Sequence, residues 1–382
     1  MVVKALALLV VLSVAVGALV WTGWPAPAEP PAPSPRADGA ICAAGLQYRG
    51  LAIQVASGYK PLETYGPLLP EIAGLGANAV LLSVAGYMEH ARSQSIYIEA
   101  RKLPAAEEFK ALLRQARALG LKTIVMPIVL LKNPKGSEWR GVIEPPDWDD
   151  WWRQYTDFVL YFADICREGE AEGLMVGSEL VSTEKSTERW VRVIEEVRPR
   201  FYGGKLGYSA NWDHYREVNF WDHLDFIGMT TYNTLAEKKA PSVDEIVERW
   251  GPIRKDILAW QRRIGKPIVM TEVGWCSQEG AAQAPWNYFQ NQKATTEGHE
   301  EQRLLYEAFV LAWSDTPELV GTFWWEWNAC EGGLNDYGYS PKNKPAEQIL
   351  RQWFAAGRET TTAPAATAQG RSTAEAGSTQ SK

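Results

Sequence analysis

Eight short apolar runs alternate with helical patterns through the middle of this 382-residue chain. The runs lie at residues 49–55, 77–84, 122–129, 173–179, 205–211, 224–230, 267–272 and 320–326. They are apolar almost throughout, which is typical of parallel strands that are buried on both faces. Repeated strand-then-helix units predict an α/β fold, specifically a closed (β/α)8 TIM barrel built as a single domain.

Several stretches between these runs have the spacing of amphipathic helices. They lie at residues 105–120, 188–197 and 243–264. In the first of them, Phe109, Leu112, Leu113, Ala116 and Leu119 fall on one helical stripe. The connection after the fifth run is short and rich in Trp, so its helix is predicted to be weak or missing.

The two ends of the chain differ from the middle in composition. Residues 1–24 combine an early lysine with an uncharged apolar run, the pattern of a signal peptide or of an uncleaved membrane anchor. Residues 25–41 form a Pro-rich linker, and residues 357–382 form a polar tail expected to be disordered. The catalytic domain is therefore predicted at residues 42–356. We expect a secreted or cell-envelope protein (periplasmic or extracellular), with a membrane tether if the first segment is retained.

The amino-acid composition limits the kinds of molecule that the protein can bind. The net charge of −7 argues against nucleic acid. The 18 Trp and 15 Tyr residues favour a flat ligand such as a sugar. The four Cys have no metal-ligand spacing, and phosphate-loop, H-E-x-x-H and G-x-S-x-G motifs are missing from the sequence. We expect a monomer that acts on a carbohydrate without a metal or cofactor. Cys276 and Cys330 each follow a strand end and could form a disulfide in an oxidising compartment.

Two glutamates stand at the ends of the fourth and seventh runs, Glu179 and Glu272. A carboxylate at the end of a buried strand is costly to desolvate unless it has a use. In a (β/α)8 barrel both strand ends open into one mouth, where active sites lie. Strict alternation along a strand would place Gly177 on the face of Glu179, and Met270 on the face of Glu272.

Glycosidases cleave a sugar linkage with two carboxyl groups, one on each side of the bond. One group protonates the leaving oxygen, and the other attacks the sugar when the two are roughly 5–5.5 Å apart, which retains the configuration at the sugar carbon. An anionic neighbour raises the pKa of the acid and keeps it protonated. We assign Glu179 as acid/base and Glu272 as nucleophile. No cofactor is implied, because two carboxyl groups and water suffice.

Three motifs carry a resemblance to a known family. They are Val-Gly-Ser-Glu-Leu at 176–180, Val-Met-Thr-Glu-Val-Gly-Trp at 269–275 and Gly-Thr-Phe-Trp-Trp-Glu-Trp-Asn at 321–328. Together they resemble the retaining glycoside hydrolases of clan A, and they are most similar to glycoside hydrolase family 113. The resemblance spans about residues 45–355. It implies an acid/base at the end of strand four, a nucleophile at the end of strand seven, and β-1,4-mannanase activity.

The resemblance also implies roles for neighbouring residues. Tyr232, just past the sixth run, is expected to hydrogen-bond the nucleophile. Most of the clan has Asn directly before the acid/base, where this chain has Ser178, so the contact to the sugar 2-hydroxyl is altered or supplied elsewhere. This departure fits mannose, whose 2-hydroxyl is axial. Trp325 is expected to lie under the −1 sugar, and Trp327, on the same face, is a further substrate-binding candidate, while Trp324 packs outward.

Other substrate-binding candidates follow from their places at strand ends. Trp275 and Trp212 offer further ring faces, and Asn211 and Gln54 offer polar contacts. A cluster of rings after the third run either extends the cleft or buries a loop: Trp139, Trp148, Trp151 and Trp152.

Three functions remain open from the sequence. The favoured function is a secreted endo-β-1,4-mannanase that acts by double displacement. A second is another clan A specificity, either a β-glucanase or an exo-β-mannosidase. A third is a non-catalytic carbohydrate-binding barrel, which would keep the Trp residues but need neither glutamate.

Overall fold

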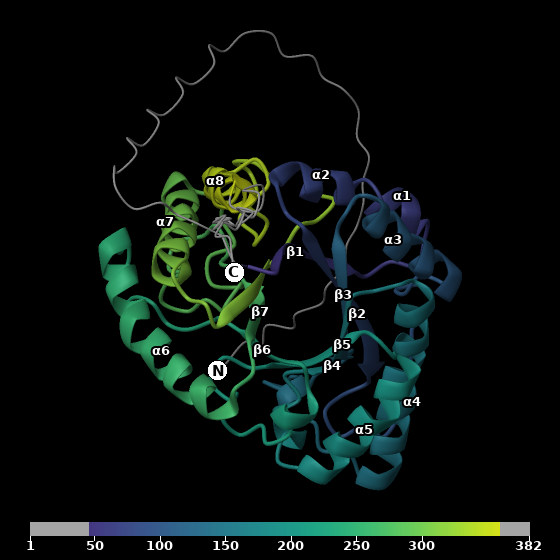
Figure 1. The fold of residues 1–382 in the computed structure, drawn as a ribbon. Coiled ribbons are helices and arrows are strands. Elements are labelled where there is room, and N and C mark those ends of the chain that lie inside the picture. Colours follow the sequence, from purple (N-terminus) through teal and green to yellow (C-terminus); the bar gives the residue numbers. More distant parts are fainter. Residues whose placement is uncertain (1–45, 360–382) are drawn as a thin grey trace, which may run out of the picture. The chain divides into compact units, whose positions relative to one another are not determined.

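The computed structural model describes residues 46–359 and confirms the predicted barrel. Eight parallel strands close into one ring in chain order, surrounded by helices (Figure 1). The strands are β1 (Tyr48–Val55), β2 (Ala79–Met88), β3 (Lys122–Leu131), β4 (Gly173–Ser178), β5 (Lys205–Ala210), β6 (Phe226–Thr230), β7 (Ile268–Val273) and β8 (Leu319–Trp324). The predicted leader, the linker and the tail beyond residue 359 lie outside the described residues.

The helices follow the apolar stripes of the sequence. They are α1 (Pro61–Tyr65), α2 (Leu68–Leu75), α3 (Ala106–Ala118), α4 (Trp148–Glu168), α5 (Thr187–Arg200), α6 (Val243–Ile264), α7 (Thr296–Trp313) and α8 (Pro345–Glu359). Helix α6 begins with a capping box formed by Ser242 and Glu245, and ends at Gly265 in the left-handed conformation. Only a 3-10 turn, Trp221–His223, lies between β5 and β6, as predicted. In the described part of the chain, no helix has the length and apolarity needed to cross a membrane.

Apolar side chains form two layers on either side of the strands. The inner layer fills the barrel with side chains from the strands, such as Leu81, Met126 and Phe323. The outer layer packs the other strand faces against the helices. Because the inner layer closes the barrel interior, a substrate can reach only the loops and strand ends at the mouth.

The expected alternation fails in β4. Met175 points into the barrel, yet a Cβ on Gly177 would meet Trp190, Tyr155 and Tyr208 of the outer layer at 2.7–2.9 Å. The register between β4 and β5 shifts between Met175 and Ser178. Such a bulge ends the strict two-residue repeat and re-aims the residues that follow. The prediction that Gly177 lies beneath Glu179 is therefore wrong: the glycine makes room for aromatic rings on the helix side.

Strand β7 has a similar irregularity. Val269 packs in the inner layer and Met270 in the outer layer. The register with β8 shifts between Met270 and Val273. Regular alternation would send Glu272 outward with Met270, so the prediction that the two share a face is also wrong. The bulge turns Glu272 toward the mouth.

Cys276 and Cys330 do not form the disulfide that their strand-end positions suggested. Cys276 is buried, Cys330 is exposed, and both are free thiols. The two loops are joined instead by polar contacts, since Ser277 Oγ donates to the carbonyl of Asp336 over 3.0 Å.

Candidate active site

Both glutamates lie at the carboxyl ends of their strands and are buried. Glu179 directly follows β4, and Glu272 is the penultimate residue of β7. The exposed fractions of the two side chains are 7% and 5%. Glu179 has a left-handed backbone with φ 51°, a conformation that non-glycine residues adopt rarely and that is concentrated at functional sites. Local backbone irregularity therefore positions both carboxyl groups.

Glu179 has two side-chain partners. Arg140 Nη2 forms an ion pair with Oε2 at 2.5 Å, and Thr230 Oγ1 donates to Oε1 over 3.0 Å. Arg140 lies in a 3-10 turn (Arg140–Val142) between β3 and α4. The sequence interpretation missed this arginine, because a single loop cation belongs to no periodic pattern or motif. Its place in the mouth becomes evident only when the loop is folded over β4.

Glu272 receives the contact that the resemblance implied. Tyr232 Oη donates to Glu272 Oε2 over 2.7 Å. Burial, and after it the negative charge of Glu179, raise the pKa of Glu272 to about 7, although Arg140 and Tyr232 act to lower it. The Glu272 carboxyl group thus interacts electrostatically with Glu179 and retains a proton up to about neutral pH. Acid catalysis by a carboxyl pair requires such a proton.

Glu326 is a third carboxyl group near this pair. Gln54 Nε2 donates to Glu326 Oε2 over 2.7 Å, and burial raises the pKa of Glu326. Its charge also contributes to the raised pKa of Glu272. Glu326 does not follow Trp324 to the outward face, because β8 ends at Trp324 and the two-residue repeat does not extend to Glu326. Gln54 and Glu326 form a polar edge of the site on the side of Glu272.

The aromatic residues after β7 and β8 divide into two groups. Trp325 is half-buried and packs against the inner layer, so it remains a candidate to lie beneath a sugar. Trp324 packs outward on Tyr306, as predicted. Trp275 has no exposed surface and packs with α7, while the indole of Trp327 donates to Glu71 of α2 over 2.8 Å. The predicted sugar contacts of Trp275 and Trp327 are therefore wrong, because both rings are enclosed in the outer layer.

The substrate-binding candidates Asn211 and Trp212, which follow β5, are linked to Glu179 through Thr230. The Asn211 amide oxygen and Thr230 Oγ1 both accept from the Trp212 backbone N–H, over 3.0 and 3.1 Å. The Trp212 ring stacks on Trp286, with centroids 5.8 Å apart. Ser178 is buried, and no partner for its hydroxyl lies among residues 46–359.

The ring cluster after β3 proves to be mainly packing. Trp151 and Trp152 lie in the first turns of α4, are buried, and contact each other edge to face. Trp148 is half-buried beside Trp151. Trp139, directly before Arg140, is the most exposed of the four, with an exposed fraction of 36%. The alternative of a buried loop cluster therefore holds for Trp151 and Trp152.

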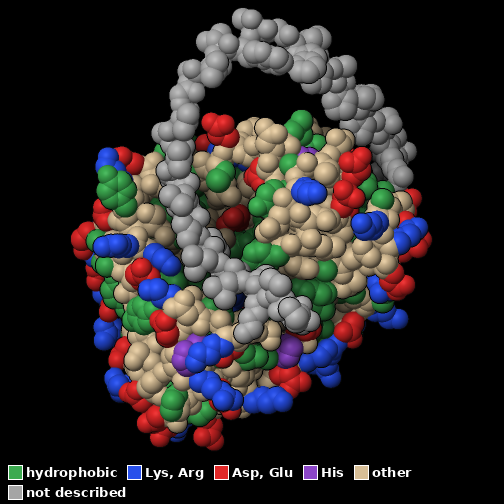
Figure 2. Space-filling view, turned by 180° about the vertical axis from the view of Figure 1, so that it is seen from behind, with side chains coloured by type: hydrophobic (Ala, Val, Ile, Leu, Met, Phe, Trp, Pro, Cys, Tyr) green, Lys and Arg blue, Asp and Glu red, His purple; other side chains and the backbone are tan. Residues whose placement is uncertain are grey.

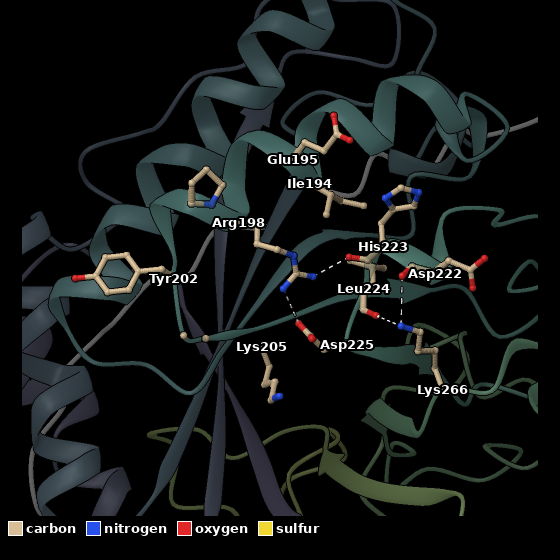
Figure 3. Close-up of a pocket in the computed structure, with 13 residues that line it drawn as sticks. Ile194, Glu195, Arg198, Tyr202, Lys205, Asp222, His223, Leu224, Asp225 and Lys266 are labelled. Carbon is tan, nitrogen blue, oxygen red and sulfur yellow. Dashed lines mark hydrogen bonds and ion pairs between the residues drawn. The ribbon is translucent and has the colours of Figure 1, made fainter.

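A large cavity lies at the opposite end of the barrel from the glutamates. It has a volume of about 880 Å³ and lies at the amino ends of β5 and β7, beside Lys205 and Lys266 (Figure 3). Arg198 pairs with Asp225, and Lys266 donates to backbone carbonyls, so these charges are already engaged. Because TIM-barrel enzymes act at the carboxyl ends of their strands, this cavity is not the candidate site.

Figure 2 shows basic and acidic side chains intermixed on one face, with acidic atoms recessed in a hollow. Within residues 46–359, no group of three or more His, Cys, Asp or Glu side chains could hold a metal ion.

Comparisons with known proteins agree with the fold and the resemblance. The model of Glycoside Hydrolase Family 113 matches residues 63–344. The structure is similar to that of the GH113 β-mannanase AaManA from Alicyclobacillus acidocaldarius in complex with ManMIm, with 26% identity, a TM-score of 0.72, and coverage of 83% of this chain and 99% of that one. No curated protein sequence matches the chain.

Two further solved structures share the fold. A GH113 β-1,4-mannanase complex has 23% identity and a TM-score of 0.72, covering 81% of this chain and 98% of the other. A glycoside hydrolase family 5 mannosidase from Rhizomucor miehei, in its E301A mutant form, has 11% identity and a TM-score of 0.54, covering 82% and 94%. Each comparison spans nearly the whole of the matched chain, so the barrel is the shared unit.

Proposed function

Because this chain belongs to glycoside hydrolase family 113, we propose that it is a retaining endo-β-1,4-mannanase in which Glu179 is the acid/base and Glu272 the nucleophile. The chain is a glycoside hydrolase that acts on carbohydrate. The specific substrate and the mechanism are the parts we propose. The observation that carries them is the buried carboxyl pair at the ends of β4 and β7, with Tyr232 bonded to Glu272.

In the first step of the proposed reaction, a Glu272 oxygen attacks the anomeric carbon of the mannose unit. The bond from that carbon to the bridging oxygen breaks, and Glu179 transfers its proton to this oxygen, which leaves as a hydroxyl of the departing sugar. The Tyr232 hydroxyl keeps Glu272 oriented for the attack. The product of this step is a sugar ester on Glu272.

In the second step, Glu179 acts as a base. Formation of the ester removes the negative charge from Glu272, so an anionic base beside it is no longer repelled. Glu179 then takes a proton from water, and the resulting hydroxide-like oxygen attacks the same carbon. The ester bond breaks, and both carboxyl groups return to their starting states with the original configuration at the sugar.

Arg140 has to move away from Glu179 Oε2 before the first step. Its Nη2 contacts Glu179 Oε2, and a carboxylate oxygen that is paired with the guanidinium has no proton to donate. Thr230 occupies the other oxygen. We therefore expect an incoming sugar to displace Arg140 from Oε2, and the guanidinium to retain its electrostatic effect on the pair.

Arg140→Gln is expected to move the acidic limb of the pH profile of kcat/KM to higher pH by about one unit. The positive charge of Arg140 acts to lower the pKa of Glu272. Without this charge, Glu272 holds its proton to higher pH, so the ionised nucleophile forms only at higher pH. The titratable groups that act on the guanidinium are Glu179, Glu272, Tyr232 and Tyr208. An unchanged profile in Arg140→Gln, with Arg198→Gln as the control, would contradict this role.

The substrate is tested by release of reducing sugar from a polysaccharide panel. The panel contains β-mannan, glucomannan, cellulose, mixed-linkage glucan and xylan, with Glu272→Gln as the inactive control. We expect activity on the two mannans that disappears in the control. Activity on a glucan or xylan alone would keep the mechanism and remove the mannanase specificity. Binding without turnover on every polymer and oligosaccharide would instead indicate the non-catalytic barrel.

The location of the protein is a further part of the proposal. The lysine and apolar run of residues 1–24 support export to the cell envelope or beyond, with or without a retained anchor. Amino-terminal sequencing of the protein from fractionated cells distinguishes cleavage from retention, and recovery in the cytoplasmic fraction alone would contradict export.

A further inference from the structure

Three large aromatic side chains are exposed within four consecutive residues between β7 and α7. Trp286, Tyr288 and Phe289 have exposed fractions of 49%, 45% and 51%. Soluble proteins seldom gather exposed rings in this way unless the rings bind something. We name residues 286–289 the aromatic segment.

Buried polar groups hold this region in place. Gln278 donates to the Asn287 carbonyl over 3.0 Å, and the Tyr339 hydroxyl donates to the carbonyl of Pro285 over 3.0 Å. Upstream, Glu301 accepts the backbone N–H groups of Gly280 and Ala282, each over 2.9 Å. Gln278 and Glu301 are nearly fully buried. The aromatic segment is therefore preorganised by its anchors, which lowers the entropy cost of binding a ligand.

A chain of contacts links the aromatic segment to Glu179. The ring of Trp286 stacks on Trp212 with an interplanar angle of 14°. The Trp212 backbone donates to Thr230 Oγ1, and Thr230 Oγ1 donates to Glu179. Because Trp212 covers one face of Trp286, the exposed area of Trp286 includes its other face. A flat ring of this kind is suited to the CH surface of a sugar.

Ring contacts also place the segment within the mouth. Tyr288 lies beside Tyr339, with ring centroids 6.5 Å apart, and Tyr339 lies beside Tyr232, the partner of Glu272, at 6.2 Å. The segment therefore borders both carboxyl groups, and Trp286 is the ring on the side of Trp212, Thr230 and Glu179.

We infer that the aromatic segment, with Trp286 as its main ring, binds the sugar units on the leaving-group side of the bond that is cut. The inference rests on the proposed function, because Glu179 marks the leaving-group side only if it is the acid/base. Units bound beyond the leaving sugar require a substrate that is longer than a disaccharide. The ligand is therefore an extended β-linked polysaccharide rather than a disaccharide.

The test compares a long substrate with one that has no sugar on the leaving-group side. Trp286→Ala is expected to lower kcat/KM on mannan and mannohexaose by about tenfold, the effect of losing part of an aromatic contact. Activity on an aryl β-mannobioside, which leaves an aryl group only, is expected to stay within about twofold of the parent. Trp286→Phe is expected to recover most of the loss, because it restores a flat ring.

Tyr202→Ala is the matched control, because Tyr202 is also exposed and lies beside the cavity at the opposite end of the barrel (Figure 3). It is expected to leave both substrates unaffected. Equal losses of Trp286→Ala on the two substrates, or no loss on the polymer, would overturn the inference. A parent protein that cleaves the aryl substrate but no polymer would also overturn it while leaving the glycosidase mechanism intact.

A binding measurement separates this inference from the proposed function. Calorimetry with mannohexaose on Glu272→Gln, with and without Trp286→Ala, requires no turnover. Binding that weakens about tenfold in the double variant supports the aromatic segment even if the catalytic roles are wrong. Equal binding by the two proteins contradicts it even if the catalytic roles are right.

Discussion

Glu272→Gln is expected to lower kcat on the polymer substrate by about 10⁴-fold or more, while the oligosaccharide still binds. The amide keeps the shape of the side chain but lacks the anionic oxygen that attacks the sugar. A loss of this size corresponds to about 5.5 kcal/mol of transition-state stabilisation. The fold should persist, because Gln keeps an oxygen that can accept from Tyr232.

Steady-state kinetics and calorimetry on the same preparation check this prediction. Glu326→Gln is the matched control, since it removes another carboxyl group near Glu272, a half-buried one, without removing the nucleophile. We expect its loss to be at least about a hundredfold smaller than that of Glu272→Gln. Comparable losses in the two variants would mean that charge in the mouth, rather than covalent attack by Glu272, governs the rate.

Glu179→Ala is expected to lower kcat/KM on mannan by about 10³-fold, but to spare the first step with a dinitrophenyl glycoside. Dinitrophenolate leaves without a proton, so this substrate does not need the acid. Hydrolysis of the sugar ester still needs the base, so the ester should accumulate. The expected observation is a rapid burst of dinitrophenolate followed by slow turnover.

Stopped-flow absorbance measures the burst, and mass spectrometry of the quenched protein detects the ester on Glu272. Thr230→Val serves as a control, because it removes a hydrogen bond to Glu179 and keeps the carboxyl group. Its effect should be far smaller and should show no burst. If Glu179→Ala lost the same factor on the dinitrophenyl and polymer substrates, the acid/base assignment would fail.

The barrel was predictable because its signals are local. Each apolar run of the sequence corresponds to an observed strand, and the helix predicted at residues 243–264 matches α6. Hydrophobic repeats and capping residues act over a few positions, so they can be recognised without knowing the partners. The weak connection after the fifth strand was predictable for the same reason.

The carboxyl pair was predictable from the sequence, but the direction in which the two side chains point was not. Glu179 and Glu272 stand at strand ends in the sequence, yet simple alternation assigned them the wrong companions, Gly177 and Met270. The bulges that redirect them depend on the register with neighbouring strands. Register is a relation between segments about 30 to 50 residues apart in the chain, and no single segment encodes it.

The sequence by itself determined the barrel, the two glutamates and the family, because periodicity and motifs are properties of short segments. Only the tertiary structure brought Arg140 onto Glu179, turned Glu326 into the mouth, and enclosed Trp275 and Trp327. Strand-end loops have no repeating pattern that specifies their direction. Their side chains acquire partners only when the closed barrel brings eight strand ends to one mouth, and long-range packing makes that selection.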